Sequence, residues 1–98
     1  MIIKLVILII TMIQKSFIIK QNEGIHARPA AKIAEKCLQL NSKVTFCNGC
    51  NKADGCSILQ LLLLDAGKGS TIDVTVSGGN EKAAIDEVGG LFENGAGI

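Results

Sequence analysis

His26 is the only histidine of the 98-residue chain, and it is followed by Ala27, Arg28 and Pro29. A proline fits the first turn of a helix, where backbone N–H groups have no intrahelical partner, so we place His26 at or beside a helix N-cap. Such a helix end offers free N–H donors and the positive end of the helix dipole, which suit an anion carried on an imidazole. The segment therefore points to chemistry on a negatively charged group.

Arg28 adds a permanent positive charge and a fork of N–H donors that matches the geometry of a phosphate. A neutral imidazole keeps a lone pair at physiological pH, so the His26 ring can attack an electrophilic phosphorus atom and later release it. On position alone, however, a solvent-exposed histidine at a helix start is the simpler interpretation. Other parts of the chain must decide between the two.

Ser57 precedes the apolar run 58–64, which predicts a two-turn helix with Ser57 as its N-cap. The default role of a serine at this position is to accept a hydrogen bond from a helical N–H. Ile58 and Leu61 can turn inward, and the leucines at 59, 62 and 63 then lie on the other face. An exposed apolar patch of this kind marks a docking site. The candidate docking residues are Ile58, Leu59 and Leu62.

Four cysteines in a chain that is 48% hydrophobic are interpreted as reduced thiols of a cytosolic protein, because the core needs no disulfides. Cys37 belongs to the core. Cys47 and Cys50 form a CxxC pair, but zinc needs four ligands and only Cys56 is near enough in sequence to be a third. The two thiols could oxidise reversibly across a hairpin, yet an incidental pair is favoured, and no metal is expected.

Alternation of apolar and polar residues predicts four strands, over 16–21, 44–46, 52–54 and 71–77. Phe17 and Ile19 share one face of the first strand, which covers MIQKSFIIK, residues 12–20, when Met12 is taken as the start of the protein. Asn48-Gly49 is a strong hairpin signal, because both residues tolerate a positive φ. The segment 67–70 resembles part of a phosphate loop, but it precedes a strand and lacks the upstream glycine, so we interpret it as a turn.

Helical spacing of apolar residues predicts helices over 27–40, over 58–64 and after Asn80, the last one ending at Asn94-Gly95. The inward residues of the first helix are Ala30, Ile33, Ala34, Cys37 and Leu38, and those of the last are Ala84, Ile85, Val88, Leu91 and Phe92. Gly89 and Gly90 cost the last helix about 1 kcal/mol each relative to alanine. The order β-α-β-β-α-β-α predicts an α+β fold with helices on one face of a sheet and solvent on the other.

Length and charge exclude several classes of protein. Ninety-eight residues form one domain that is too small for a deep enclosed catalytic cleft. A net charge of +1, three Phe and no Trp or Tyr provide neither a basic field nor a stacking platform for nucleic acid. The apolar start of the chain is shorter than the roughly 20 residues that span a bilayer. We interpret residues 1–11 as an apolar extension from an over-long gene prediction, with a signal peptide as the alternative, and 12–98 as the domain.

GIHARPAAK, followed by ADGCSILQLLLLDAGKGSTIDVTVSGG, resembles the HPr family, the histidine-containing phosphocarriers of the bacterial phosphoenolpyruvate-dependent sugar phosphotransferase system. The matches run from about Phe17 to Phe92. The resemblance implies an open-faced β-sandwich in which an antiparallel four-stranded sheet carries three helices on one face. It also implies that His26 is phosphorylated on Nδ1 by enzyme I and passes the group to enzyme IIA, that Arg28 stabilises the phosphate, and that Ser57 is phosphorylated by HPr kinase.

We therefore predict a cytoplasmic, monomeric phosphoryl carrier without a cofactor, which acts as a protein substrate of enzyme I and not as an enzyme. Its expected partners are enzyme I, enzyme IIA domains and HPr kinase/phosphorylase, with neither nucleic acid nor membrane. One alternative is a binding module that is regulated through Ser57 and has no transport role; the presence of both His26 and Arg28 argues against it. The other is a thiol or metal module built on Cys47, Cys50 and Cys56.

Overall fold

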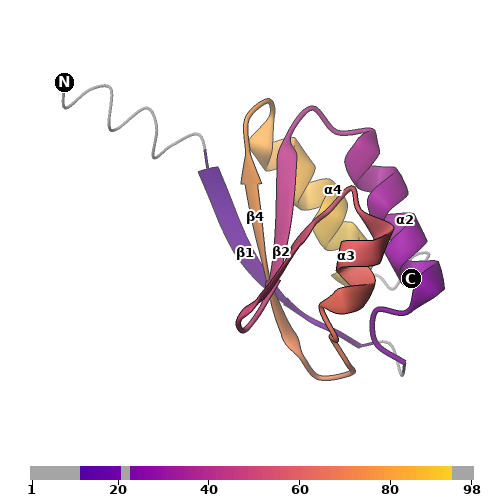
Figure 1. The fold of residues 1–98 in the computed structure, drawn as a ribbon. Helices are drawn as coiled ribbons and strands as arrows, with labels where there is room; N and C mark the ends of the chain where they lie inside the picture. Colours follow the sequence, from indigo (N-terminus) through magenta and orange to yellow (C-terminus); the bar gives the residue numbers. More distant parts are fainter. Residues whose placement is uncertain (1–11, 21–22, 94–98) are drawn as a thin grey trace.

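Four antiparallel strands and three helices form the computed structural model, which describes residues 12–20 and 23–93 (Figure 1). In chain order the elements are β1 (Met12–Ile18), α2 (Ala27–Leu38), β2 (Lys43–Asn48), β3 (Asn51–Asp54), α3 (Ile58–Leu63), β4 (Thr71–Ser77) and α4 (Glu81–Glu93). The strand order in the sheet is β1-β4-β2-β3. The predicted α+β fold, with its β-α-β-β-α-β-α order, is confirmed.

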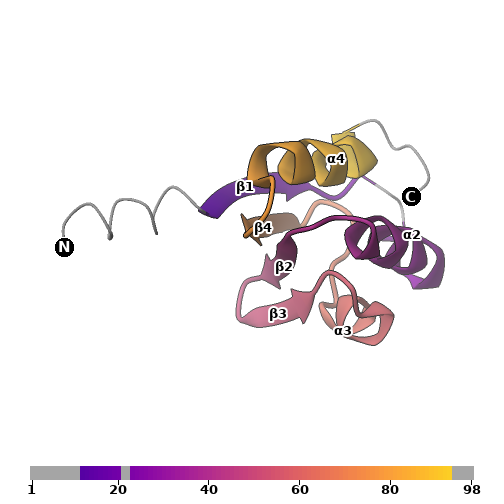
Figure 2. The same ribbon diagram turned by 90° about the horizontal axis from the view of Figure 1, so that it is seen from above.

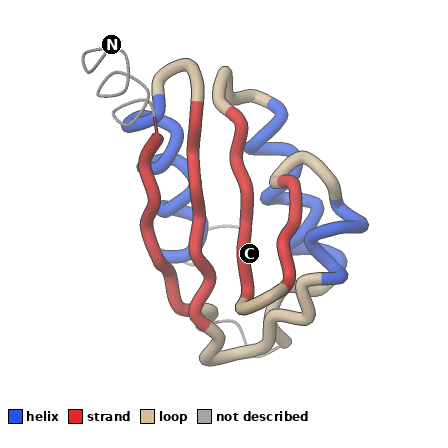
Figure 3. The backbone as a smooth tube through the Cα atoms, turned by 60° about the vertical axis from the view of Figure 1, so that its left-hand side comes forward, coloured by secondary structure: helices blue, strands red, loops and turns tan. Residues whose placement is uncertain are grey.

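One face of the sheet is covered by all three helices, and the other face is open (Figures 2 and 3). The alternation along β4 explains this arrangement, because Ile72, Val74 and Val76 are fully buried while Asp73 and Thr75 are partly exposed between them. Figure 2 shows α4 over β1 and β4, while α2 and α3 lie side by side over the rest of the sheet. The helix starts predicted at His26 and Ser57 therefore lie on the covered side of the sheet or at its edges.

Three phenylalanines join the sheet to α4. The Phe17 and Phe92 rings stack with centroids 5.4 Å apart, and Phe46 is tilted against Phe92 at 6.1 Å. A Cβ on Gly89 would lie 2.9 Å from the Phe17 ring, so the small residue lets α4 approach the sheet closely. The conformational cost of a glycine in this helix is thus offset by packing.

The bounds of several elements differ from those predicted. β1 begins at Met12, as predicted, and ends at Ile18, before the predicted end; all seven of its residues pair with β4, from Met12↔Ser77 to Ile18↔Thr71. α2 ends at Leu38, which is 71% exposed and does not belong to the buried stripe. Leu91 packs only partly against the core. The predicted end of the last helix at 94–95 lies outside the described residues.

The hairpin between β2 and β3 is shifted by one residue from the predicted position. Asn48 pairs with Asn51, so the two turn residues are Gly49 and Cys50. Gly49 has a φ of 61°, and a glycine with positive φ at the first turn position is typical of a type II′ turn. Cys47 pairs with Lys52 and not with Cys50, so the two cysteines do not face each other across the hairpin.

Candidate functional site

His26 is the N-cap residue of α2, as predicted, with an extended backbone at φ −101° and ψ −167°. Its carbonyl accepts the first helical hydrogen bond, from the Ala30 N–H at 2.9 Å. Its side chain makes no capping hydrogen bond, and the residue is half-buried. The imidazole is therefore available at the helix end and is not enclosed in the hydrophobic core.

Arg28 lies in the first turn of α2 and is exposed. The first turn contains no acidic residue, and among the described residues no carboxylate forms an ion pair with Arg28. Its guanidinium charge is thus not neutralised locally. Together with the dipole of a twelve-residue helix, it makes this end of α2 attractive to an anion.

The loop before His26 is held by a contact that sequence analysis missed. The Ile25 N–H donates to the Ala66 carbonyl at 2.9 Å, in the segment that leaves α3. Gly24 has a φ of 68°, and a Cβ there would lie only 2.1 Å from the Ala66 oxygen. Gly24 is therefore required for the close approach of the two segments. In the sequence, only the presence of a glycine at position 24 indicated an unusual backbone, and no pattern indicated that it contacts Ala66.

Ser57 caps α3, as predicted, and it belongs to a local network of hydrogen bonds. Its Oγ accepts from the Gln60 N–H at 3.2 Å, and Gln60 Oε1 accepts from the Asp54 N–H at 2.8 Å. Asp54 Oδ1 accepts from the Cys56 N–H at 2.9 Å. Ser57 Oγ thus satisfies the Gln60 N–H of α3, and the Asp54 carboxylate lies beside this helix start.

The exposed apolar residues of α3 form a patch, which we call the α3 patch and which consists of Ile58, Leu59, Leu62 and Leu63. Leu59 and Leu63 are the most exposed, at 66% and 67%. The prediction that Ile58 turns inward is wrong, since it is 45% exposed. α3 has six residues, and of the apolar run only Leu61 and Leu64 reach the core.

The cysteines do not assemble into a site in the described part of the chain. Cys37 is in the core, as predicted, where burial together with nearby Cys56 and Asp54 raises its pKa to about 12. Burial and Asp54 also raise the pKa of Cys56, which disfavours the reactive thiolate form of both side chains. The Cys47 thiol donates to the Gly49 carbonyl at 3.3 Å. No three metal-ligating side chains come together among residues 12–20 and 23–93.

Comparison with known protein families gives a match that covers most of the chain. Residues 13–94 match the family described as PTS HPr component phosphorylation site. The chain belongs to the HPr family. Its HPr-type fold follows from the same element order, and the helix end that carries His26 lies within the matched residues. Residues 1–11, the predicted extension, lie outside both the match and the described residues.

Relatives of this HPr-family chain include two kinds of phosphocarrier. It is 42% identical over 78 residues to phosphocarrier protein NPr of Proteus mirabilis, covering 79% of this chain and 87% of the relative. It is 31% identical over 83 residues to phosphocarrier protein HPr of Treponema pallidum, covering 85% and 94%. The chain is thus similar to both HPr and NPr proteins, over most of their length.

Solved structures show the same fold. HPr-C-His from Thermoanaerobacter tengcongensis superposes with a TM-score of 0.82 at 26% identity, covering 88% of this chain and 97% of that one. HPr from Bacillus anthracis gives a TM-score of 0.79 at 23% identity, covering 84% and 98%. Within the described residues, no helix has the length and apolar character needed to cross a membrane.

Proposed function

We propose that this HPr-family phosphocarrier accepts a phosphoryl group on Nδ1 of His26 from phosphorylated enzyme I and passes it to an enzyme IIA domain. The proposal depends on the half-buried imidazole at the start of α2, which makes no capping hydrogen bond. The chain that contains it matches a phosphorylation-site family over residues 13–94. Proteins of this family carry phosphate and do not themselves catalyse a reaction. His26 is only half-buried at a helix end, so each partner would complete the site in turn.

In the proposed transfer, the lone pair of the neutral His26 ring attacks phosphorus, and the bond between phosphorus and enzyme I breaks with its electron pair remaining on enzyme I. The phosphoryl oxygens then lie near the N–H groups of Ala27 and Arg28, which have no intrahelical partner. The guanidinium of Arg28 shares the negative charge. Transfer to enzyme IIA repeats the same exchange with His26 as the leaving group.

The α3 patch is proposed as the surface on which both partners dock. Its four apolar side chains, Ile58, Leu59, Leu62 and Leu63, are exposed, and α3 lies beside α2 (Figure 2). An apolar patch beside a charged group-transfer site lets one surface serve several partners in turn. Action as a monomer in the cytoplasm is part of the same proposal.

A loading assay tests the proposal. Phosphoenolpyruvate and enzyme I should add one acid-labile phosphoryl group to the wild-type chain, which mass spectrometry at neutral pH would detect. His26→Ala should add none, while an exposed-residue control such as Lys82→Ala should load normally. An unchanged mass of the wild-type protein, with an enzyme I that loads a known HPr, would overturn the proposal.

A second candidate is a carrier for an NPr-type, nitrogen-related phosphotransferase system instead of the sugar system. The 42% identity to the NPr of Proteus mirabilis favours it. The two candidates differ in the partner and not in the chemistry on His26. Loading rates measured side by side with the enzyme I that serves HPr and the one that serves NPr would separate them, because the faster donor identifies the system.

Regulation through Ser57 is the remaining candidate, and its position as the N-cap residue directly before the α3 patch favours it. Phosphate on Ser57 would place negative charge beside the apolar patch and so oppose docking of enzyme I. The test is incubation with ATP and HPr kinase, followed by the His26 loading assay. Incorporation at Ser57 that leaves the His26 loading rate unchanged would contradict a regulatory role.

A further inference from the structure

The Asn48 side chain donates hydrogen bonds to the segment that leaves α3, and it is not one of the residues that form the turn between β2 and β3. It is the last residue of β2, and the turn itself is made by Gly49 and Cys50. Its side-chain Nδ2 donates to the Leu64 carbonyl at 3.0 Å and lies 3.5 Å from the Asp65 carbonyl oxygen. Carbonyls at a helix C-terminus have no intrahelical partner. Asn48 therefore supplies a donor from the sheet to the end of α3.

The segment that Asn48 holds has an unusual backbone. Asp65 has a φ of 55°, and no other non-glycine residue in the described part of the chain has a positive φ. This conformation is rarely adopted by residues with a Cβ and persists where the surroundings hold it. The hydrogen bonds from Asn48 reach the two carbonyls on either side of the Asp65 Cα, and they therefore act at this turn.

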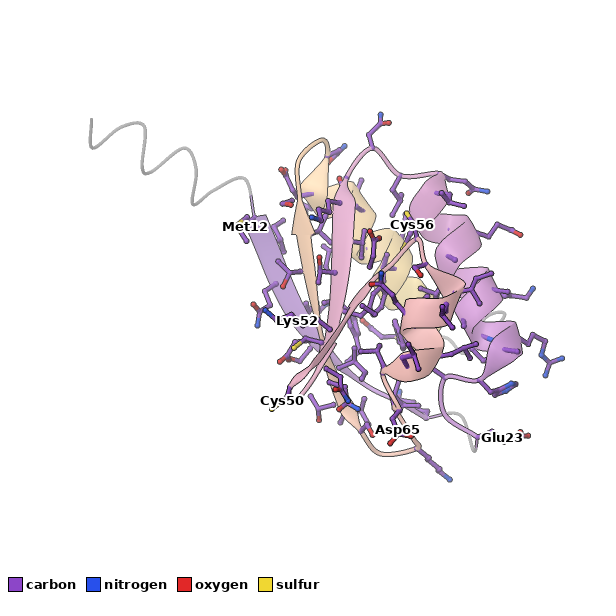
Figure 4. All side chains as sticks on the ribbon, in the orientation of Figure 1. Met12, Glu23, Cys50, Lys52, Cys56 and Asp65 are labelled. Carbon is purple, nitrogen blue, oxygen red and sulfur yellow. The ribbon has the colours of Figure 1, made fainter. Side chains whose placement is uncertain are left out.

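The same segment holds the loop before His26. The next residue, Ala66, is 5% exposed, and its carbonyl accepts from the Ile25 N–H at 2.9 Å. Gly24 fits against this carbonyl with no space for a side chain. Figure 4 shows Glu23 and Asp65 at the same end of the molecule, beyond the ends of α2 and α3. A shift of the Ala66 carbonyl would therefore move the backbone one residue before His26.

We propose that Asn48 is a positioning residue for phosphoryl transfer: it holds the 64–66 segment, which in turn holds Ile25 and so the orientation of the His26 ring. The proposal rests on the proposed function of His26. Proper placement of a nucleophile accounts for a large part of the rate of a group transfer, and a misplacement of about 1 Å can cost on the order of 100-fold. Asn48 would act on the rate of transfer and not on partner binding.

The test compares Asn48→Ala with Asn51→Ala. Asn51 is a matched control, because it lies in the same hairpin and its Nδ2 is 3.5 Å from the same Leu64 oxygen, a longer and weaker bond. With enzyme I as donor, Asn48→Ala should lower the maximal loading rate about 10-fold and leave the KM for the carrier within about 2-fold. Asn51→Ala should change neither by more than about 2-fold.

Two NMR readouts report on the link itself. The Ile25 amide should exchange with solvent about 10-fold faster in Asn48→Ala than in Asn51→Ala, because its hydrogen bond to Ala66 is loosened. The resonances of the His26 ring should shift in the same variant. Asn48→Asp keeps the size of the side chain and replaces the donor by an acceptor, so it should give the same changes if Asn48→Ala fails to fold.

Normal Ile25 exchange and a normal maximal rate in a folded Asn48 variant would overturn the proposal. A raised KM with an unchanged maximal rate would also overturn it, since Asn48 would then act through the α3 patch. If the wild-type chain is not loaded at all, the proposed function fails. The Ile25 exchange and the His26 ring shift still decide in that case whether Asn48 positions the ring.

Discussion

The N-termini of α2 and α3 differ in how the cap residue uses its side chain. At α3 the Ser57 side chain accepts from the N–H of the third helical residue, Gln60. At α2 the third helical residue is Pro29, which has no N–H to give, and the His26 side chain caps nothing. α4 follows the α3 pattern, with the Ala83 N–H donating to Asn80. Of these three helix starts, only that of α2 leaves its cap side chain free.

This difference distinguishes a helix end whose cap residue stabilises the helix from one whose cap residue is proposed to carry a phosphoryl group. A side-chain cap bonds one of the four N–H groups at a helix N-terminus that have no intrahelical partner, and so it stabilises the helix. At α2 the cap position holds His26, the proposed nucleophile, instead of a capping group, and the nearby exposed Arg28 has no carboxylate partner among the described residues. The start of α2 thus lacks the side-chain capping hydrogen bond that α3 and α4 have, and its cap side chain is left available for the proposed phosphoryl transfer.

Converting the α2 start to the α3 type should have the largest effect on function. His26→Asn introduces a good capping side chain, which can accept from the Arg28 N–H. Loading by enzyme I should be abolished, while the free energy of unfolding should rise by about 0.5 kcal/mol, less than for a full cap because Pro29 cannot donate. Urea unfolding and the loading assay measure the two changes. A variant that is less stable than wild type would contradict the view that the helix end is left unsatisfied.

Disturbing the contact between Gly24 and Ala66, which supports the start of α2, should lower both the free energy of unfolding and the rate of loading. Gly24→Ala forces a Cβ to 2.1 Å from the Ala66 oxygen at a φ of 68°, so we expect a loss of about 2 to 3 kcal/mol in the free energy of unfolding. Gly49→Ala is the control, because its φ of 61° is equally unfavourable but nothing lies within 4 Å of the new Cβ. It should lose about 1 kcal/mol and load normally. Equal losses from both variants would mean that the Ala66 contact is not tight.

Removing the charge at the α2 start should affect function without affecting folding. Arg28→Ala should slow loading about 10- to 100-fold, since a charge-assisted hydrogen bond to phosphate is worth about 1.5 to 3 kcal/mol. The melting temperature should stay within about 2 °C because Arg28 is exposed and makes no ion pair among the described residues. Arg28→Lys should recover part of the rate. A loading rate equal to that of wild type in Arg28→Ala would remove Arg28 from the site.

Removing the α3 cap should have the smallest effect on transfer. Ser57→Ala deletes the acceptor for the Gln60 N–H, at a cost of about 1 kcal/mol in the free energy of unfolding. Loading on His26 should remain within about 2-fold of wild type, because α3 keeps its patch. Thermal unfolding and loading rates measure both quantities. A loss of loading as large as that of Arg28→Ala would show that the two helix ends are not functionally distinct.

Much of this contrast could be predicted from the sequence, where the pattern is local. The seven alternating residues of β4, the His26 and Ser57 cap positions and the burial of Cys37 follow from periodicity and from residue type, and the structure confirms them. The His26 environment could be predicted because the deciding residues, Arg28 and Pro29, are its near neighbours in sequence. The roles of these residues in phosphoryl transfer remain predictions.

The parts that could not be predicted depend on contacts between distant segments. Helical spacing placed Ile58 inward, but a six-residue helix set against the sheet turns only part of its apolar run to the core. Asn48-Gly49 and Gly49-Cys50 are both acceptable turns, and strand register selected the second. The contact of Gly24 with Ala66 joins two loops far apart in the chain, so periodicity carries no information about it.

The most direct measurement is the identity of the phosphorylated atom in the wild-type chain. After loading from phosphoenolpyruvate through enzyme I at neutral pH, phosphorus-coupled NMR of the imidazole should place one phosphoryl group on Nδ1 of His26. A phosphoryl group on any other residue, or a His26 ring that is unchanged in a fully loaded sample, would contradict the account.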